Sequence, residues 1–472
     1  MGARPGRRRH RHPRHQARPV PPGEPRRERR DPECGRPHGA RRDRPPRLHG
    51  GGPLSRRRHG HARRLRPAAD LRRRVRATTM ANITIIGGGL AGLTAAISAA
   101  EQGARVTVHE AHSHAGGRAR SALGPYVTND GPHTFFDNGD AWHWLLQRGL
   151  AGRYVRLSFH EWTRMRFRHQ GRLRMTLPGG YMRMTWMHRG IDVPVDRSFQ
   201  DWASERFAQQ TVDEALGFLG PILFDGDPGR LSAAFVWERL LRVGTPRFPL
   251  PSRYFMGGWG ALIERMQRVA RARGVVIETG SRLTELPTGG PVIVATSLAA
   301  ARSLLGDDSL QWPSGTAALL DMAVTHSKKD GNVSFDMDEG GFTSQYSDHD
   351  PSLAPEGQAL FQGQMPIRPG ESKADALARL EKLFDLTTPG WQQRILWRRE
   401  GVSRGRTGAL DLPGLSWRDR PAVDRGDGVY LAGDSVAAPG ILAETSINSA
   451  LRAAELALSA RPAAHHSAVL GR

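Results

Sequence analysis

Three glycines near residue 90 form the pattern with the clearest chemical meaning. Gly87, Gly89 and Gly92 fit G-x-G-x-x-G, and Glu110 lies 23 residues after the first of them. The first glycine allows a tight turn, the second lets the backbone approach a pyrophosphate, and the third lets a helix pack closely on a strand. An acid at this distance can accept hydrogen bonds from ribose hydroxyls. The spacing therefore predicts a site for a dinucleotide.

A strand, a helix and a second strand must position these residues. Residues 83–86 are a short apolar run rich in isoleucine, which is typical of a buried parallel strand. We expect a helix over residues 90–102, whose first amides point at the phosphates, and a second strand over residues 103–110. This order predicts an α/β fold of the Rossmann-like type.

A second set of glycines could extend the same site. Gly116, Gly117 and Arg118 follow the ribose acid. Glycines admit close backbone contact, and arginine offers a fork of donors to phosphate. Near the C-terminus, residues 429–432 form another apolar run that predicts a buried strand, with Gly433-Asp434 directly after it. An aspartate at the carboxyl end of a strand can accept hydrogen bonds from sugar hydroxyls.

Together these motifs resemble the FAD-dependent flavoprotein superfamily of amine oxidases, protoporphyrinogen oxidases and phytoene desaturases. The resemblance covers most of residues 80–460 and is nearest to bacterial phytoene dehydrogenase-like NAD(P)/FAD-dependent oxidoreductases. The superfamily pattern G-x-x-x-E-x-x-x-x-S-G-x-x-A is matched from Gly440 onwards, except that Ala450 replaces a glycine. The resemblance implies a non-covalently bound FAD, and the globular part has no cysteine for a cysteinyl link, since the one cysteine is Cys34.

The resemblance also implies which residues contact the cofactor. Residues 274–286 are expected to form two short strands, the second of which would pair with the adenine near Leu283. The implied FAD contacts are Gly87, Gly89, Leu90, Ala91, Gly92, Glu110, Ala111, Gly117, Arg118, Leu283, Gly433, Asp434, Gly440, Ile441 and Glu444.

Catalytic residues stay unassigned, because hydride transfer to a flavin requires no protein acid or base. The D-G-P-H turn at residues 130–133 resembles one in phytoene desaturase-like members, which makes His133 and Phe135 candidates for positions near the flavin. Arg398 and Arg399 could steer an acidic group of a substrate, although a solvated surface is the favoured reading. The flavin-adjacent lysine of many amine oxidases cannot be assigned, and no metal site is predicted.

Composition divides the chain into unequal parts. Residues 1–79 contain 26 arginines and no lysine and carry a net charge of +20, whereas the remainder is nearly neutral. Such a segment cannot bury a core and is expected to be disordered. It fits an over-extended reading frame with a true start at Met80 better than a nucleic-acid-binding tail. The predicted domains are FAD-binding for residues 80–135, 252–305 and 415–460, an inserted α+β substrate domain for 136–251 and 306–414, and a flexible tail for 461–472.

The resemblance implies an oxidoreductase that removes a hydride equivalent from an apolar substrate of polyene or isoprenoid type to flavin N5. The alternatives are a flavin amine oxidase, a protoporphyrinogen oxidase-like enzyme, and a non-enzyme with the fold of the GDP-dissociation inhibitors. The expected partners are an apolar small molecule and an unidentified electron acceptor, with no nucleic acid bound by the globular part. No apolar run is long enough for a transmembrane helix, so the expected location is the cytoplasm, with peripheral membrane contact left open.

Overall fold

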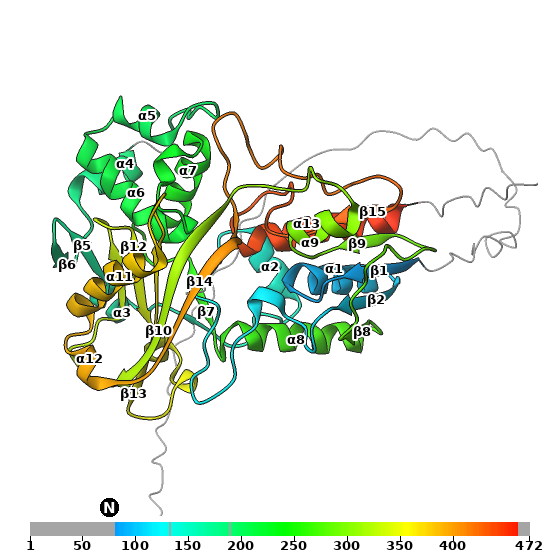
Figure 1. Cartoon of the computed structure of the whole chain (residues 1–472), viewed down its shortest axis with the longest axis horizontal. Helices are drawn as coiled ribbons and strands as arrows, with labels where there is room; N and C mark the ends of the chain where they lie inside the picture. Colours follow the sequence, from blue (N-terminus) through cyan, green and yellow to red (C-terminus); the bar gives the residue numbers. More distant parts are fainter. Residues whose placement is uncertain (1–80, 132–133, 188–189, 461–472) are drawn as a thin grey trace, which may run out of the picture. The chain divides into compact units, whose positions relative to one another are not determined.

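Five short strands from distant parts of the chain form one parallel sheet. The computed structural model describes residues 81–131, 134–187 and 190–460 (Figure 1). The expectations for residues 1–79 and 461–472 lie outside this range. The strand order is β15-β9-β1-β2-β8, and every neighbouring pair is parallel. The strands are β15 (Val429–Leu431), β9 (Val292–Val294), β1 (Asn82–Ile86), β2 (Arg105–Glu110) and β8 (Val276–Thr279).

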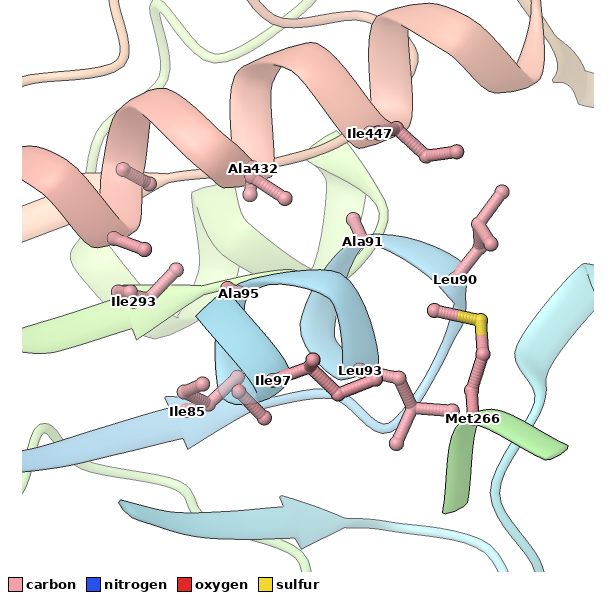
Figure 2. Close-up of a cluster of buried hydrophobic side chains, with 14 of the residues drawn as sticks. Ile85, Leu90, Ala91, Leu93, Ala95, Ile97, Met266, Ile293, Ala432 and Ile447 are labelled. Atoms are coloured by element: carbon pink, nitrogen blue, oxygen red, sulfur yellow. The ribbon is translucent and has the colours of Figure 1, made fainter. Parts of the chain in front are cut away.

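Helix α1 (Leu90–Glu101) is held tightly by its neighbours. Nine of its twelve side chains are buried, which its run of small and aliphatic residues permits. Figure 2 shows Leu90 and Ala91 of this helix facing Ile447 of helix α13 (Ala443–Ser459), and Ile97 of the helix next to Ile85 of the sheet. Helix α8 (Gly258–Ala272) also packs on α1 and contributes Met266 to the same core. Helix α1 is therefore held in place by the sheet, α8 and α13.

A second, mostly antiparallel sheet has the order β14-β10-β13-β12-β11-β5-β6. Helix α11 (Lys373–Thr387) covers part of it through the buried residues Leu380 and Phe384, which pack with Phe361. The strands are β14 (Ile395–Ala409), β10 (Ser314–Thr325), β13 (Gln358–Pro366), β12 (Gly341–Gln345), β11 (Val333–Asp336), β5 (Arg166–His169) and β6 (Arg172–Arg174).

A small third sheet and a group of helices complete the described residues. The sheet pairs β3 (Phe135–Phe136), β7 (Ser252–Phe255) and β4 (Tyr154–Arg156). The remaining helices are α2 (Asp140–Gln147), α3 (Phe159–Arg164), α4 (Gly179–Met187), α5 (Phe199–Ser204), α6 (Gln209–Leu223), α7 (Ala233–Arg239), α9 (Leu298–Leu305), α10 (Tyr346–His349) and α12 (Trp391–Arg394). A π-helical turn, Leu240–Gly244, continues from α7.

The structure confirms the α/β, Rossmann-like fold class, and it corrects one detail. The second strand expected within residues 274–286 is absent, because only β8 forms there. Gly280 adopts a positive φ of +69° directly after β8, which ends the extended backbone. Leu283 therefore lies in a loop, where its partly buried side chain packs against the core. Within the described residues, no helix combines the length and apolar composition needed to cross a bilayer.

Candidate cofactor site

The glycine turn between β1 and α1 is packed on one side and open on the other. A Cβ on Gly92 would overlap the carbonyl oxygen of Gly87, and a Cβ on Gly87 would lie 2.6 Å from the carbonyl oxygen of Ala295. By contrast, the nearest heavy atom to a Cβ on Gly89 would be 4.0 Å away. The protein's own packing therefore explains the first and third glycines but not the second. The open side at Gly89 fits the close approach of a pyrophosphate.

Glu110 lies beside this turn at the end of β2. Its Oε2 accepts a hydrogen bond from the backbone N–H of Gly88 (2.9 Å), and its Oε1 accepts one from that of His112 (2.9 Å). Burial alone would raise the pKa of Glu110, but the hydrogen bonds from His112 and Gly88 outweigh it and hold the pKa below its usual value. The carboxylate is thus ionised and fixed where a ribose diol could donate to it.

The second glycine pair lies against the first turn. The Gly116 N–H donates to the carbonyl oxygen of Gly88 (2.9 Å), and Gly89 and Gly116 form an isolated parallel bridge. Gly116 and Gly117 have φ values of +128° and +53°, which favour glycine. The two glycine motifs that the sequence analysis treated as one site are therefore in direct contact.

Arg118 and Asp434 are joined although 316 residues separate them. The guanidinium donates twice to the carboxylate, Nη1 to Oδ2 at 2.5 Å and Nη2 to Oδ1 at 2.8 Å. The carboxylate raises the pKa of Arg118; burial alone would raise the pKa of Asp434, but Arg118 outweighs it and holds that pKa below its usual value. The ion pair therefore joins the turn after β15, which contains Asp434, to the second glycine pair, which directly precedes Arg118.

The entry to helix α13 is built around a buried carboxylate. Glu444, whose residue is 3% exposed, accepts from the backbone N–H of Ile441 (3.2 Å) and from Arg242 (2.5 Å). Burial raises the pKa of Glu444, and Arg242 only partly offsets this. Gly440 has a φ of +115° and Leu442 one of +50°, so the backbone turns sharply just before the helix. Because the Glu444 carboxylate is bonded to Ile441 and Arg242, it is not available to a ligand. The groups that this turn can present to a ligand are its remaining backbone amides.

Ser449 ties the turn after β15 to helix α13. Its hydroxyl accepts from the Gly433 N–H (2.9 Å) and donates to the Gly433 carbonyl (3.0 Å). At the position where the superfamily pattern has a glycine, Ala450 is fully buried in the core.

Of the predicted contacts, most gather in one place. The residues that lie at the strand ends and helix entries of the five-stranded sheet are Gly87, Gly89, Leu90, Ala91, Gly92, Glu110, Ala111, Gly117, Arg118, Gly433, Asp434, Gly440, Ile441 and Glu444. Leu90, Ala91 and Ile441 are buried residues, and of these Ile441 lines the pocket described below. Leu283 is two residues after Ser281, whose N–H donates to the Glu110 carbonyl (2.9 Å). The loop that contains Leu283 therefore borders the site, although it does not form the expected strand.

Of the two residues expected near the flavin, His133 and Phe135, the structure describes only Phe135. Phe135 is 1% exposed, and its ring packs against Trp142, Phe255 and Trp259 at centroid distances of 5.7 to 6.1 Å. Phe135 is thus enclosed by aromatic side chains, and its place near the flavin stays a prediction. The apolar face of β3 is part of the core.

The side chains of Arg398 and Arg399 are about one third exposed, at 30% and 35%. Arg399 donates to the buried carboxylate of Asp321 (2.5 and 2.8 Å) and to the carbonyl of Asn129 (2.8 Å). Arg398 donates to Glu381 (2.5 Å) and to the glutamate two residues after it. Both arginines are held in ion pairs along β14, which agrees with the favoured interpretation of a solvated surface more closely for Arg398 than for Arg399.

A small pocket that opens to solvent, and whose interior has room for about one water molecule, adjoins the site. Asp434, Ile441 and Leu442 form part of its wall, so it shares residues with the predicted cofactor contacts. Two arginines, Arg239 and Arg420, also line it. No motif marks these arginines or Arg242 in the sequence, because their position beside the site depends on how α7 and residues 411–420 fold back onto it.

Comparisons with known proteins agree with this geometry. Residues 85–148 match the family model of the NAD(P)-binding Rossmann-like domain, and residues 292–458 match that of the flavin containing amine oxidoreductases. No curated protein matches the chain. The two matched regions and the fold place the chain in the superfamily of FAD-dependent, amine oxidase-like flavoproteins, and the protein is an oxidoreductase of that superfamily.

Solved structures share the fold at low identity. An oxidoreductase from Methanosarcina mazei is 16% identical with a TM-score of 0.65, over 79% of this chain and 100% of that one. Cyclohexylamine oxidase from Brevibacterium oxydans IH-35A is 16% identical with a TM-score of 0.61, over 80% and 99%. Reduced UDP-galactopyranose mutase is 13% identical with a TM-score of 0.59, over 80% and 96%. At these identities the likeness shows the fold alone.

Proposed function

We propose that the protein binds FAD without a covalent link and oxidises an apolar substrate of polyene or isoprenoid type by removing a hydride equivalent. When bound, the flavin supplies the electron-accepting chemistry at its N5 atom. The chain's own contribution is to bind, orient and exclude water. The observation that supports FAD is the open side of the turn at Gly89, next to an ionised Glu110 and the Arg118–Asp434 pair.

Each part of the site has a distinct task in this proposal. The amides at the start of α1 hold the diphosphate, since a helix N-terminus favours negative charge. Glu110 accepts from the ribose, and Asp434 accepts from the sugar-like chain next to the flavin. The backbone amides between Gly440 and Glu444, other than that of Ile441, would stabilise the negative charge that a reduced flavin carries.

The charge of the pocket wall disfavours a protonated amine as the substrate. Arg239 and Arg420 are both buried there. Arg420 is paired with Asp411, and the one carboxylate that lines the pocket, Asp434, is paired with Arg118, so Arg239 is the charge in excess. Two unit charges of the same sign repel strongly where little water screens them. A protonated amine would therefore be disfavoured, whereas the aliphatic side chains Leu223 and Leu410 suit an apolar molecule.

Amine oxidation is the second candidate. It is favoured by the match of residues 292–458 to the flavin containing amine oxidoreductases. A protoporphyrinogen oxidase-like reaction and a role without redox chemistry, like that of the GDP-dissociation inhibitors, are further alternatives that the same test separates.

Anaerobic flavin reduction decides among these. The full-length protein is purified, its flavin absorbance is recorded, and polyenes, porphyrinogens and primary amines are added without oxygen. Bleaching by polyenes alone is the expected result, and reoxidation by oxygen, a quinone or NAD(P)⁺ then identifies the acceptor. Bleaching by amines instead would overturn the substrate class. A colourless protein that FAD cannot reconstitute would overturn the cofactor.

We also propose peripheral contact with an anionic lipid surface, from which an apolar substrate could be drawn. Exposed aromatic rings gather where Phe159 and Trp162 pack against Phe248, at centroid distances of 5.6 and 6.2 Å. The exposed Trp186 is held beside them by a hydrogen bond to the Pro246 carbonyl (3.1 Å). Residues 151–190 contain nine arginines and one acidic residue. Interfacial aromatic side chains and basic charge together are typical of membrane-surface binding.

Vesicle flotation tests this contact. The protein is expected to float with vesicles that contain phosphatidylserine, to float less with pure phosphatidylcholine, and to lose binding in Phe159→Ser/Phe248→Ser. Equal recovery of wild type and double variant with acidic vesicles would refute it.

A further inference from the structure

Arg239, at the end of α7, is a buried cation without a matched carboxylate. Its residue is 6% exposed, and its Nη1 donates to the carbonyl oxygen of Phe235 (3.0 Å). The guanidinium lies over the Phe235 ring, 3.4 Å from the centroid. Among the described residues, the carboxylate within 4 Å of it is that of Glu238, at 3.4 Å, and that side chain is 53% exposed to water. Solvent therefore screens the carboxylate nearest to Arg239, and Asp411, the other carboxylate that raises its pKa, is hydrogen-bonded to Arg420.

Arg420, on the wall of the same pocket, is a buried arginine whose charge is compensated by a buried carboxylate. Its guanidinium donates twice to Asp411, at 2.9 and 2.8 Å, and both residues are buried. Arg239 has no such partner, and Arg420 and Arg242 add repulsion. Burial lowers the pKa of Arg239 to about 10, which still leaves it protonated at neutral pH. A buried charge whose carboxylate partner is half exposed to water is only partly compensated, and a bound anion would offset the remaining cost in free energy.

The surroundings of Arg239 indicate the kind of anion. Most of the other side chains that line the pocket are aliphatic, including Ile222, Leu223 and Leu410. Asp434 does not neutralise Arg239, because its two oxygens are bonded to Arg118. One unmatched guanidinium in a small apolar pocket suits a single monoanion on an apolar body, and a guanidinium fork matches a carboxylate in shape.

We propose that this pocket binds the carboxylate of an otherwise apolar substrate, with Arg239 as the partner of the anion. The inference rests on the proposed function and narrows it, since the substrate becomes an apolar carboxylic acid rather than a pure hydrocarbon. Arg239 is thus a specificity-determining residue, which holds one end of the substrate beside the flavin contacts at Asp434 and Ile441.

The chain offers a matched control for this arginine. Arg206 has the same local arrangement: its Nη1 donates to the carbonyl four residues earlier, at Trp202 (3.0 Å), it lies over that residue's ring, and it pairs with the preceding Glu205 (3.1 Å). Its side chain is 44% exposed, and it does not line the pocket. Arg206→Gln therefore removes the same local contacts without touching the proposed site.

The test compares octanoate, 1-octanol and octylamine as ligands of the full-length, FAD-loaded protein. Binding is followed by calorimetry and by the change in flavin absorbance. Wild type is expected to bind octanoate at least about 10-fold more tightly than octanol, as one charge-assisted hydrogen-bonded contact allows, and octylamine weakest. Arg239→Gln should lose this preference while keeping its octanol affinity, Arg239→Lys should keep part of it, and Arg206→Gln should keep all of it.

Several outcomes would overturn the proposal. Wild type that does not prefer octanoate refutes it, even if Arg239→Gln fails to fold. So does an Arg239→Gln variant that keeps the preference. If that variant instead loses FAD affinity or shifts the flavin midpoint potential with the preference unchanged, Arg239 serves the cofactor. Failure of the proposed function is distinguishable, because a protein that takes up no flavin can still show octanoate binding by calorimetry.

Discussion

Two alanine substitutions in one glycine turn should affect different properties: Gly92→Ala should lower the stability of the fold, and Gly89→Ala should weaken cofactor binding. Gly92 and Gly89 are three residues apart, but only Gly92 is enclosed by the protein. A Cβ on Gly92 would overlap the Gly87 oxygen and lie 3.0 Å from the Gly87 carbonyl carbon. That carbonyl cannot move freely, because the Gly87 N–H is bonded to the His109 carbonyl (2.8 Å) and Ala295 lies against it.

The magnitudes follow from these distances. Overpacking of this kind costs roughly 1–3 kcal/mol or more, and the gain of about 1 kcal/mol in helix propensity from alanine offsets only part of it. Gly89→Ala meets no atom closer than 4.0 Å, and its φ of −77° suits alanine. Its cost in unfolding free energy should be at most about 1 kcal/mol, because alanine is a poorer N-cap than glycine. The added methyl group would, however, occupy the space for the pyrophosphate.

Urea denaturation of the flavin-free proteins and FAD titration of the refolded ones measure both effects. Gly92→Ala should lower the unfolding midpoint. Gly89→Ala should keep that midpoint but bind FAD at least about 10-fold more weakly, which corresponds to the loss of one hydrogen bond to a charged group. Wild-type FAD affinity in Gly89→Ala would refute the placement of the diphosphate. Wild-type stability in Gly92→Ala would refute the packing argument.

Three further results are expected. Ser449→Ala should lower the unfolding free energy by roughly 1–2 kcal/mol in urea denaturation, because the Gly433 N–H and carbonyl both lose a partner, and an unchanged midpoint contradicts this. Asp434→Asn should weaken FAD binding about 10- to 100-fold by equilibrium dialysis, since it also releases Arg118; equal affinity would argue against a cofactor role. The pKa of Glu161 lies at about 2, because hydrogen bonds from a buried histidine and a serine outweigh burial, so its stabilisation is present above pH 4.5 and lost as the pH falls toward 2. Glu161→Gln should therefore flatten the stability profile between these pH values, and a slope equal to that of wild type speaks against it.

The sequence by itself determined the local parts of the site. The spacing of Gly87, Gly89 and Gly92 states where the backbone must turn, approach a ligand and pack, and each of these needs is met by the residue's own φ or lack of a Cβ. The expected strand and helix around them lie within one residue of β1 and α1. These features are predictable because they depend on residues a few positions apart.

Only the tertiary structure decided which side chains meet. Arg118 pairs with Asp434, and Glu444 with Arg242, across more than 200 residues, and no local pattern encodes a partner so distant. Burial is likewise a property of the assembled fold: it encloses Phe135, which local motif reasoning placed at the flavin. It also buries Arg239 beside a carboxylate, Glu238, that stays half exposed, although the local contacts of Arg239 are the same as those of the surface arginine Arg206. Residue type and spacing thus determine the local backbone conformation, while contacts between segments that are distant in sequence determine the charge and shape of the site.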